Sequence, residues 1–419
     1  MVPEGWETGQ VRDLVESLDA GVSVNSEDDG NTCAPYKILK TSCVSSGVFK
    51  ENETKSVLDD NEINRLKEPV INDSIIISRM NTPALVGANG YVEHAPKNTF
   101  LPDRLWQAKP KKEKVEMRWL AYWFGSSHTR YILSSLGTGT SGSMKNITKG
   151  DVLNSKILIP PVPEQKKIAQ ILSTWDKAIT TTEKLLKNSQ QQKKALMQQL
   201  LTGKKRLLDD NGVRFNGEWR KCRIEEYFDV GSSKRVLQED WKNKGVPFYR
   251  TRELVSLSKN EKFRSEIFIS EDLFLGLSEK YGVPSEGDFL ISGVGTLGIS
   301  YQVKHGDRFY FKDGNVLWLK KRPGVNSDFF KYSFDSKYVQ NQIKAQASIT
   351  TVGTYTITNA RKTKFLCPPT LSEQEKISEV MNACDDEILM IQLKLKKLKK
   401  EKKALMQQLL TGKRRVKLD

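Results

Sequence analysis

The sequence predicts two tandem α/β (α+β) globular domains, separated by two long coiled-coil helices in a pseudo-two-fold arrangement. Three observations lead to this fold class. The chain contains a long internal repeat, two segments with coiled-coil apolar spacing, and short apolar runs bounded by turn residues in the remaining chain. A chain of 419 residues is long enough to form several domains, each with its own hydrophobic core.

The internal repeat is clearest in two copies of KKALMQQLLTGK, which begin at Lys193 and Lys402, an offset of 209 positions. The same offset relates PEQKKIAQIL, beginning at Pro163, to SEQEKISEVM, beginning at Ser372. A period this long, present only twice, indicates a fused pseudo-dimer rather than a solenoid. The predicted parts are a globular domain at 1–160, a helix at 161–205, a globular domain at 206–369 and a helix at 370–419.

Both predicted helices carry signals for their ends and a continuous apolar seam. Ser372 and Glu375 form a capping box at one start, and Gly203 and Gly412 are typical helix stops. Between these ends, apolar residues alternate at spacings of four and three, which is typical of a coiled coil. We expect the two helices to pair antiparallel, and about 40 residues at 1.5 Å each would span roughly 60 Å. The predicted seam residues are Ile168, Leu172, Trp175, Ile179, Leu186, Ile377, Met381, Ile388, Ile391, Leu395 and Leu398.

The globular domains combine short strands with helical pieces. The runs SIIIS (74–78) and DFLIS (288–292) are typical of strands, whereas MRWLAYWF (117–124) and SDFFKYSFDSKYVQNQI (327–343) are helical in pattern. These patterns predict a mixed α/β class for each domain and leave the strand order open.

The charge of the chain favours a polyanionic partner. The chain has 67 basic and 51 acidic residues, for a net charge of +16, which would attract nucleic acid in a salt-dependent way. The alternative is that the charge only keeps the protein in solution. The segment 391–419 holds 11 basic and 2 acidic residues, so it is either a solvated helix face or a contact with DNA phosphates.

Several predicted loops are rich in the side chains that contact base edges and phosphates, which are Arg, Lys, Asn and Thr. A solvated loop is the alternative for any single residue, so the prediction depends on the clusters. The candidate DNA-binding residues are Lys40, Thr41, Ser42, Arg79, Asn81, Lys145, Asn146, Arg250, Thr251, Arg252, Thr296, Thr351, Thr354 and Tyr355.

The sequence predicts no catalytic residue and no metal site. LLTGKK lacks the features of a phosphate-binding P-loop, and no NPPF/Y tetrapeptide of the kind adenine methyltransferases use is present. His94, His128 and His305 are isolated, and the five cysteines have no CxxC spacing, which fits a reducing cytoplasm. No secretory signal or membrane span is expected. Two alternatives stay open: a self-contained DNA methyltransferase or nuclease, and a coiled-coil scaffold for other proteins.

The two segments PPVPEQKKIAQILSTWDKAI (160–179) and PPTLSEQEKISEVMNACDDEI (368–388) resemble the specificity subunit of type I restriction-modification systems. The resemblance covers the whole chain in the order recognition domain, helix, recognition domain, helix. GDFLISGVGTLG (287–298) is also similar to a strand-turn motif of this family, whereas DSIIISRMNTPALVGANG (73–90) departs from it.

The resemblance implies a non-catalytic, DNA-binding subunit in the cytoplasm of a bacterium or archaeon. Each recognition domain would read one half of a bipartite, asymmetric site in double-stranded DNA, and the helices would act as a ruler that sets the spacer. The implied partners are two modification subunits, which methylate adenine with S-adenosylmethionine, and restriction subunits, which translocate and cut DNA with ATP. S-adenosylmethionine, ATP and Mg²⁺ would therefore bind the partners, and no cofactor is expected in this chain.

Overall fold

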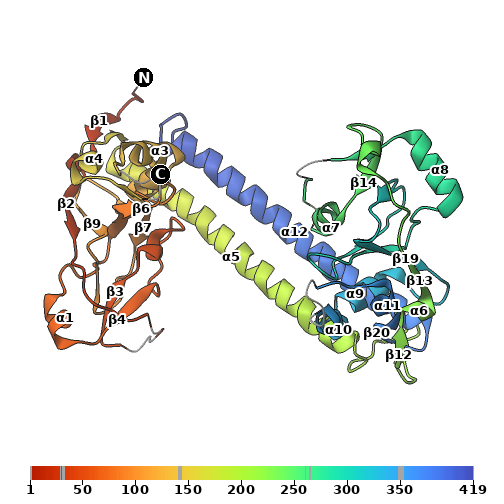
Figure 1. Ribbon diagram of the computed structural model, residues 1–419. Helices are drawn as coiled ribbons and strands as arrows, with labels where there is room; N and C mark the ends of the chain where they lie inside the picture. Colours follow the sequence, from red (N-terminus) through yellow and green to blue (C-terminus); the bar gives the residue numbers. More distant parts are fainter. Residues whose placement is uncertain are drawn as a thin grey trace. The chain divides into compact units, whose positions relative to one another are not determined.

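The computed structural model describes residues 2–28, 30, 34–139, 144–259, 261–263, 266–347 and 353–418. The chain divides into two compact units (Figure 1). The first unit comprises Met1–Glu183 and Leu393–Asp419, and the second comprises Lys184–Gln392. Two 39-residue helices, α5 (Val162–Leu200) and α12 (Leu371–Leu409), each contribute to both units. The predicted fold class, with two tandem mixed domains and two long helices, is confirmed.

The globular part of the first unit is built on a four-stranded antiparallel sheet of order β2-β9-β5-β7 and a three-stranded sheet of order β4-β3-β8. Two strand pairs, β1-β11 and β10-β6, complete it. The strands are β1 (Glu7–Gln10), β2 (Val15–Ala20), β3 (Tyr36–Leu39), β4 (Thr54–Val57), β5 (Ser74–Ser78), β6 (Met80–Asn81), β7 (Asn89–Val92), β8 (Thr99–Phe100), β9 (Leu105–Pro110), β10 (Lys145–Asn146) and β11 (Lys156–Ile159). The helices are η1 (Val11–Asp13), η2 (Thr41–Val44), α1 (Asp60–Arg65), α2 (Met117–Gly125), α3 (Ser127–Leu136) and α4 (Lys149–Leu153).

The globular part of the second unit repeats this plan. Its sheets have the orders β13-β19-β16-β17, β15-β14-β18 and β12-β20. The strands are β12 (Arg220–Arg223), β13 (Phe228–Gly231), β14 (Val246–Tyr249), β15 (Phe268–Ile269), β16 (Phe289–Ser292), β17 (Ser300–Gln302), β18 (Tyr310–Phe311), β19 (Val316–Lys321) and β20 (Lys364–Cys367). The helices are α6 (Ile224–Tyr227), η3 (Gln238–Asp240), α7 (Thr251–Ser258), α8 (Glu271–Tyr281), α9 (Ser327–Asp335), α10 (Lys337–Ala347) and α11 (Ile357–Lys362).

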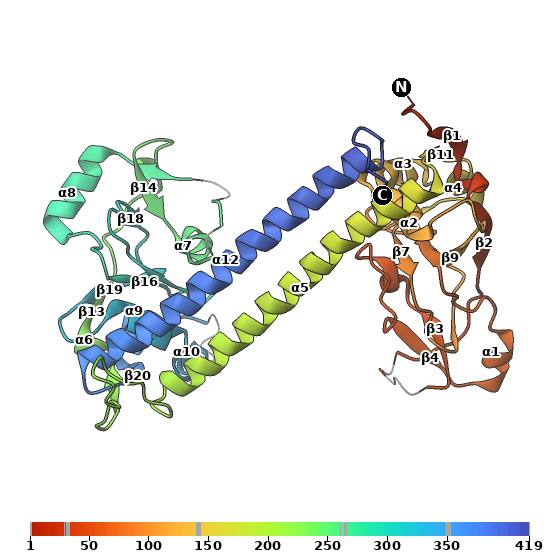
Figure 2. The same cartoon turned by 180° about the vertical axis from the view of Figure 1, so that it is seen from behind.

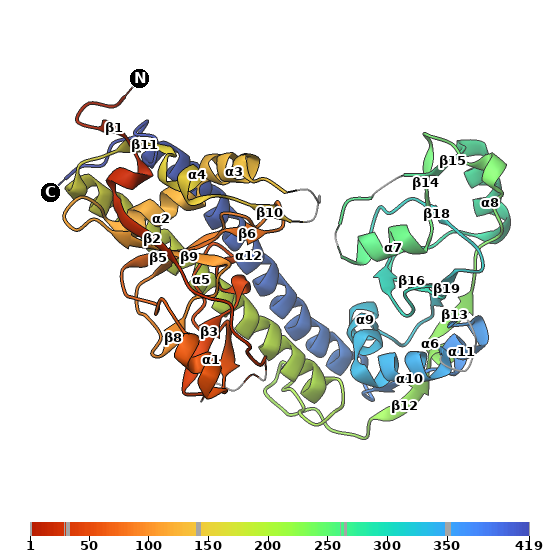
Figure 3. The same ribbon diagram turned by 60° about the vertical axis from the view of Figure 1, so that its left-hand side comes forward.

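The two globular parts share an unusual detail of pairing. In each three-stranded sheet the central strand, β3 or β14, has one antiparallel and one parallel neighbour. The element that follows this strand differs: η2 is a single 3₁₀ turn, whereas α7 is an eight-residue helix that lies beside β16 and β17 (Figure 3). The duplication in the sequence is therefore a duplication of topology, with divergence in the elements between matching strands.

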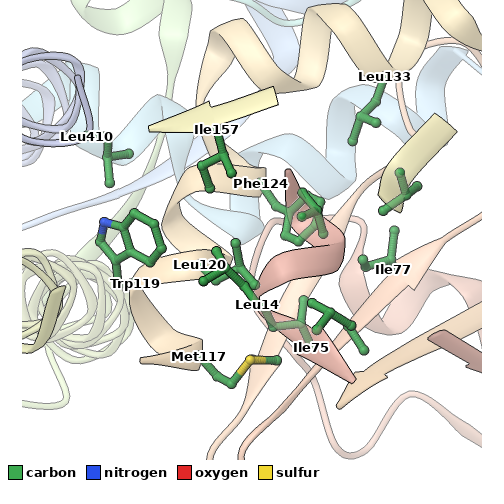
Figure 4. Close-up of a cluster of buried hydrophobic side chains, with 14 of the residues drawn as sticks. Leu14, Ile75, Ile77, Met117, Trp119, Leu120, Phe124, Leu133, Ile157 and Leu410 are labelled. Atoms are coloured by element: carbon green, nitrogen blue, oxygen red, sulfur yellow. The ribbon is translucent and has the colours of Figure 1, made fainter. Parts of the chain in front are cut away.

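The core of the first unit joins distant parts of the chain (Figure 4). Leu14 and Trp119 come from its globular part, Ile168 and Leu172 come from α5, and Leu410 follows the last residue of α12. Complete burial of a large apolar side chain contributes about 1.5–3 kcal/mol, so this cluster anchors both long helices to the domain.

The core of the second unit is dominated by aromatic rings. Phe228 and Phe289 lie 5.8 Å apart in an edge-to-face pair, and Phe330 is 5.0 Å from Phe289. Such pairs add about 0.5–1.5 kcal/mol each to the hydrophobic contribution. Leu200 of α5 and Met381 of α12 are buried in the same cluster, so the second unit holds both helices in the same manner.

Within each unit, the portions of α5 and α12 run side by side and antiparallel (Figure 2). In the second unit Lys193 pairs with Asp385, and in the first unit Glu183 pairs with Lys399. The predicted seam residues are shielded at every position, whereas the neighbouring lysines and glutamines are mostly exposed. Buried seam residues are Ile168, Leu172, Ile377, Met381 and Ile391; partly buried ones are Trp175, Ile179, Leu186, Ile388, Leu395 and Leu398. Among the described helices, none is both long and apolar enough to cross a membrane.

Candidate nucleic-acid interface

Four candidate residues of the first unit gather at one short strand pair. Asn81 of β6 lies opposite Lys145 of β10 in the register of the pair, and Asn146 follows Lys145. The backbone carbonyl of Arg79 accepts a hydrogen bond from the backbone N–H of Ile147 at 3.0 Å, which extends the pairing by one step. Two loops that are distant in the sequence therefore present one cluster of polar and basic side chains.

The side chains of this cluster are partly fixed by the protein itself. The guanidinium carbon of Arg79 lies 5.8 Å from the ring centroid of Trp106. Lys145 Nζ donates to the carbonyl of Ser134 at 2.7 Å. The Nε atom of Arg79 is buried and has no hydrogen-bond partner among the described residues. Arg79 therefore has an unused donor, although its ring contact already holds its position.

Lys40, Thr41 and Ser42 form a second local group, at the end of β3 and the start of η2. Lys40 Nζ lies 2.5 Å from a carboxylate oxygen of Asp28, and Ser42 Oγ donates to Glu53 at 2.6 Å. These contacts order the turn, and the ion pair neutralises part of the positive charge that the sequence placed there.

In the second unit, Arg250, Thr251 and Arg252 lie at the start of α7. This position directly follows β14 and corresponds to that of Lys40–Ser42 after β3. The carbonyl of Asn315 accepts hydrogen bonds from the backbone N–H of Gly293 at 2.9 Å and from the hydroxyl of Thr251 at 3.5 Å. The start of α7 is thereby joined to the glycine-rich turn after β16.

The same turn brings in two further candidates. Thr354 pairs with Val294 in an isolated β-bridge, and the carbonyl of Thr296 accepts a hydrogen bond from Ser292 Oγ at 2.5 Å. Thr351 lies outside the described residues. Arg250, Thr251, Arg252, Thr296 and Thr354 thus belong to neighbouring loops, although they come from three separate stretches of the sequence.

Tyr355 was wrongly predicted as a DNA contact. Its side chain is only 1 % exposed, and its hydroxyl donates to Thr363 Oγ1 at 2.8 Å. Burial raises the pKa of this phenol. The aromatic ring is part of the core of the second unit, so the hydrophobic effect and not base stacking accounts for its place in the loop.

Sequence reasoning missed a pair of buried carboxylates at the starts of the long helices. Glu164 accepts hydrogen bonds from Trp6 Nε1 at 2.9 Å and from Arg415 Nε at 2.8 Å. Glu373 accepts from Arg206 Nε at 2.5 Å and Nη2 at 2.7 Å. Burial would raise the pKa of Glu164, but the hydrogen bonds from Arg415 and Trp6 outweigh it and lower the pKa. The signal was available, because both Glu and both Arg residues are separated by the repeat offset.

A second missed feature ties the globular part of the first unit to both helices. Asp176 of α5 accepts hydrogen bonds from the hydroxyl of Tyr122 at 2.7 Å and from Lys402 Nζ of α12 at 2.6 Å. Lys402 Nζ also lies 5.1 Å from the ring centroid of Tyr122. Burial and the hydrogen bond to Asp176 raise the pKa of Tyr122. Tyr122, Asp176 and Lys402 therefore each contact the other two, and this triad joins α2, α5 and α12.

The second unit contains the same triad. Asp385 of α12 accepts from the hydroxyl of Tyr332 at 2.7 Å and from Lys193 Nζ of α5 at 2.5 Å. Lys193 Nζ is 5.0 Å from the ring centroid of Tyr332. The roles of the two helices are exchanged relative to the first unit, as a duplicated chain with antiparallel helices requires.

The helices of the first unit also border a groove of about 880 Å³. Ile171, Trp175 and Leu405 supply apolar lining, and Lys167 and Arg414 supply positive charge. Among the described residues, no group of three or more His, Cys, Asp or Glu side chains is placed to hold a metal ion.

Comparison with known proteins agrees with this architecture. The type I restriction enzyme MjaVIII specificity subunit of Methanocaldococcus jannaschii is 24% identical over 437 residues, which cover 99% of this chain and 94% of that protein. The S subunit of a type I restriction-modification system from M. genitalium has the same fold, with a TM-score of 0.58 at 16% identity and coverage of 98% and 99%. A structure from work on complex assembly and conformational transition of the type I R-M system has a TM-score of 0.57 at 17% identity, with the same coverage.

The match to a protein family is more specific than these likenesses. The family profile described as the type I restriction modification DNA specificity domain matches residues 3–189 and again residues 216–403. The two matches fall on the two copies of the internal repeat and together cover most of the chain. The chain therefore belongs to the family of type I restriction-modification DNA specificity proteins.

Proposed function

We propose that this chain is the specificity subunit of a type I restriction-modification enzyme and that it reads a bipartite, asymmetric DNA site. The observation that carries this proposal is the pair of specificity domains, which share one topology but differ in the side chains at matching positions. Lys40–Ser42 after β3 and Arg250–Arg252 after β14 illustrate the difference. Because base recognition depends on such side chains, two domains that share one topology but carry different loop residues would recognise different half-site sequences.

Electrostatics supports DNA as the ligand of both domains. The net charge of +16 provides a sequence-independent attraction to phosphates, and Arg, Lys and Asn at the candidate loops provide donors for base edges. Each well-formed bidentate contact would contribute about 1–3 kcal/mol of discrimination between bases. Affinity is expected to come mainly from phosphates, and sequence preference from a few loop residues.

The two long helices would act as the ruler between the half-sites and as the docking surface for modification subunits. The apolar and basic groove of the first unit supports docking, as do Leu389 and Met390 of α12 in the second unit, which are 50 % and 66 % exposed. S-adenosylmethionine would then bind the modification subunits, and ATP and Mg²⁺ would bind the restriction subunits. The family match favours this division of labour over a self-contained methyltransferase or nuclease and over a protein scaffold.

The test is the DNA methylation pattern of a host that expresses this chain with its modification subunits. We expect one split, asymmetric motif, and replacement of residues 206–369 by a different specificity domain should change only one half of it. Methyl transfer by the purified chain without partners would contradict the proposal. A methylome in which neither half of the motif changes on domain replacement would also contradict it.

A further inference from the structure

A buried carboxylate lies behind the arginines that begin α7. Glu253 is 2 % exposed and accepts hydrogen bonds from Arg250 Nε at 2.9 Å, Arg250 Nη2 at 2.7 Å and Arg252 Nε at 2.7 Å. It also accepts from the backbone N–H of Arg250 at 3.0 Å. Burial would raise the pKa of Glu253, but the hydrogen bonds from Arg250 and Arg252 outweigh it and lower the pKa. The carboxylate therefore stays charged and holds one edge of the Arg250 guanidinium.

An aromatic ring holds the face of the same guanidinium. The guanidinium carbon of Arg250 lies 5.5 Å from the ring centroid of Trp241, within the range of a cation–π contact. Trp241 in turn packs against Phe248 of β14, with ring centroids 6.0 Å apart. Arg250 is thus fixed on its edge by Glu253 and on its face by Trp241, and both are anchored to the sheet.

One end of the Arg250 guanidinium is left for a ligand. Nη1 of Arg250 makes no hydrogen bond to any residue within the described part of the chain, and the second hydrogen of Nη2 points away from the bond to Glu253. These two donors form the end of the guanidinium fork. Two parallel donors match the two acceptors, O6 and N7, that guanine presents in the major groove of DNA.

We infer that Glu253 is a positioning residue that fixes Arg250 to read a guanine in the half-site of the second unit. This inference rests on the proposed function, since it takes the second unit to be a DNA reader. A free arginine side chain loses rotamer freedom when it binds, whereas Arg250 has already been restricted by Glu253 and Trp241. The same restriction dictates which acceptors the fork can meet, so Glu253 contributes to sequence preference without touching DNA.

The alternative is that Glu253 only caps α7, but a helix cap does not require contacts with the guanidinium groups of Arg250 and Arg252. Glu226 has the corresponding position in α6, and its carboxylate accepts from the backbone N–H of Arg223 at 2.6 Å. Glu226 is exposed, and the hydrogen bond from the Arg223 guanidinium goes to Glu225 instead. Capping needs only one carboxylate oxygen at the surface, whereas Glu253 is buried and binds two guanidinium groups. Glu226 is therefore a matched control.

The experiment uses the full chain assembled with its modification subunits and a DNA library in which both half-sites are randomised. We expect Glu253→Gln and Trp241→Leu each to lower the preference for guanine at one position of the second half-site by about tenfold or more, the size of one good base contact. The first half-site should be unchanged, and Glu226→Gln should leave both half-sites unchanged. Arg250→Ala should abolish the same preference, and adding Glu253→Gln to it should cause no further loss.

The possible failures are distinguishable. If Arg250→Ala abolishes the guanine preference while Glu253→Gln and Trp241→Leu keep it, Glu253 does not position Arg250 and the inference is overturned. If the chain reads a split motif that none of these variants alters, the inference fails and the proposed function stands. If the unmodified complex selects no split motif, the proposed function itself fails. Thermal unfolding of each variant identifies any general loss of the folded state, and Trp241→Leu keeps the test available if Glu253→Gln does not fold.

Discussion

At the scale of single residues, Tyr355 shows why residue type alone could not define the DNA-contacting set. Tyrosine in a loop rich in glycine and threonine suggests a contact with bases, but the loop turns this ring into the core of the second unit. Which way a side chain points depends on the pairing of Tyr355 N–H with the carbonyl of Gly293, and that pairing joins residues far apart in the sequence. Arg79 and Lys145 were predicted as DNA contacts from the composition of two separate loops, and nothing in the sequence indicated that β6 and β10 bring these loops together.

For Tyr355→Phe we expect a loss of stability of about 1 kcal/mol, because a buried hydrogen bond to Thr363 is removed with little change of volume. The methylation motif should not change. Urea unfolding of the chain and methylome sequencing of the host are the two measurements. If Tyr355→Phe changed the base preference and left the free energy of unfolding unchanged, Tyr355 would be a DNA contact after all.

Glu164 gives a prediction about pH. Its pKa is lowered in the folded state, so the folded chain binds a proton less readily than the unfolded chain does. The stabilisation by Arg415 is therefore complete above the ordinary carboxyl pKa of 4.5 and is lost as the pH falls through the lower folded value. Arg415→Met should lower the melting temperature at pH 7 and reduce its decline on acidification.

Arg206→Met is the variant of the second unit that matches Arg415→Met in the comparison of melting temperatures at pH 7, because Arg206 binds Glu373 with the same geometry. If Arg415→Met melts as the unmodified chain does at pH 7, the pair with Glu164 contributes nothing to stability. A steeper decline on acidification than in the unmodified chain would contradict the assigned direction of the pKa shift.

At the scale of elements, the helices were predictable and the sheets were not. Glycine stops and apolar spacing are local signals, and Gly203 and Gly412 follow the ends of α5 and α12 by three residues. The predicted cap was wrong, because Ser372 lies inside α12 and the hydroxyl of Thr370 accepts the hydrogen bond from the backbone N–H of Glu373 at 3.3 Å. The predicted helix at 370–419 also continued beyond Leu409, where α12 ends. Strand order depends on pairing between distant segments, so the parallel neighbour of β3 or β14 has no local signature. The helical segment predicted at 327–343 is two helices, α9 and α10, because Ser336 adopts an extended conformation between them.

Each triad is predicted to stabilise the attachment of a globular part to α5 and α12. In the first unit, Tyr122→Phe and Lys402→Met should each destabilise the chain, and their combined effect should be smaller than the sum by about 1 kcal/mol, since both bind Asp176. The control combines Tyr122→Phe with Lys193→Met, which belongs to the other triad, and should be additive. The free energy of unfolding of each single and double variant is measured with urea. If the effects of Tyr122→Phe and Lys402→Met were additive, the two side chains would not stabilise the chain cooperatively.

At the scale of the whole molecule, the repeat carries the functional argument. Duplication accounts for two readers and two helices, and the family match falls on both copies. The bases that are read could not be obtained from the sequence, because they depend on how loops such as 292–296 and the start of α7 meet in space. The sequence therefore predicts the order of the domains and helices well, but it predicts the DNA contacts only as groups of loop residues.

The ruler function leads to a prediction about spacing. Four residues inserted within 184–192 of α5, together with four inserted at the repeat-related positions 393–401 of α12, would lengthen both helices by about 6 Å. Because base pairs are stacked at about 3.4 Å, the preferred spacer should grow by one or two base pairs while both half-sites stay the same. The insertion in α5 alone is the control, since it shifts the seam of one helix against the other and should reduce methylation more strongly than the paired insertion does. Altered half-site bases, or a spacer unchanged by the paired insertion, would show that the helices do not set the distance between the two readers.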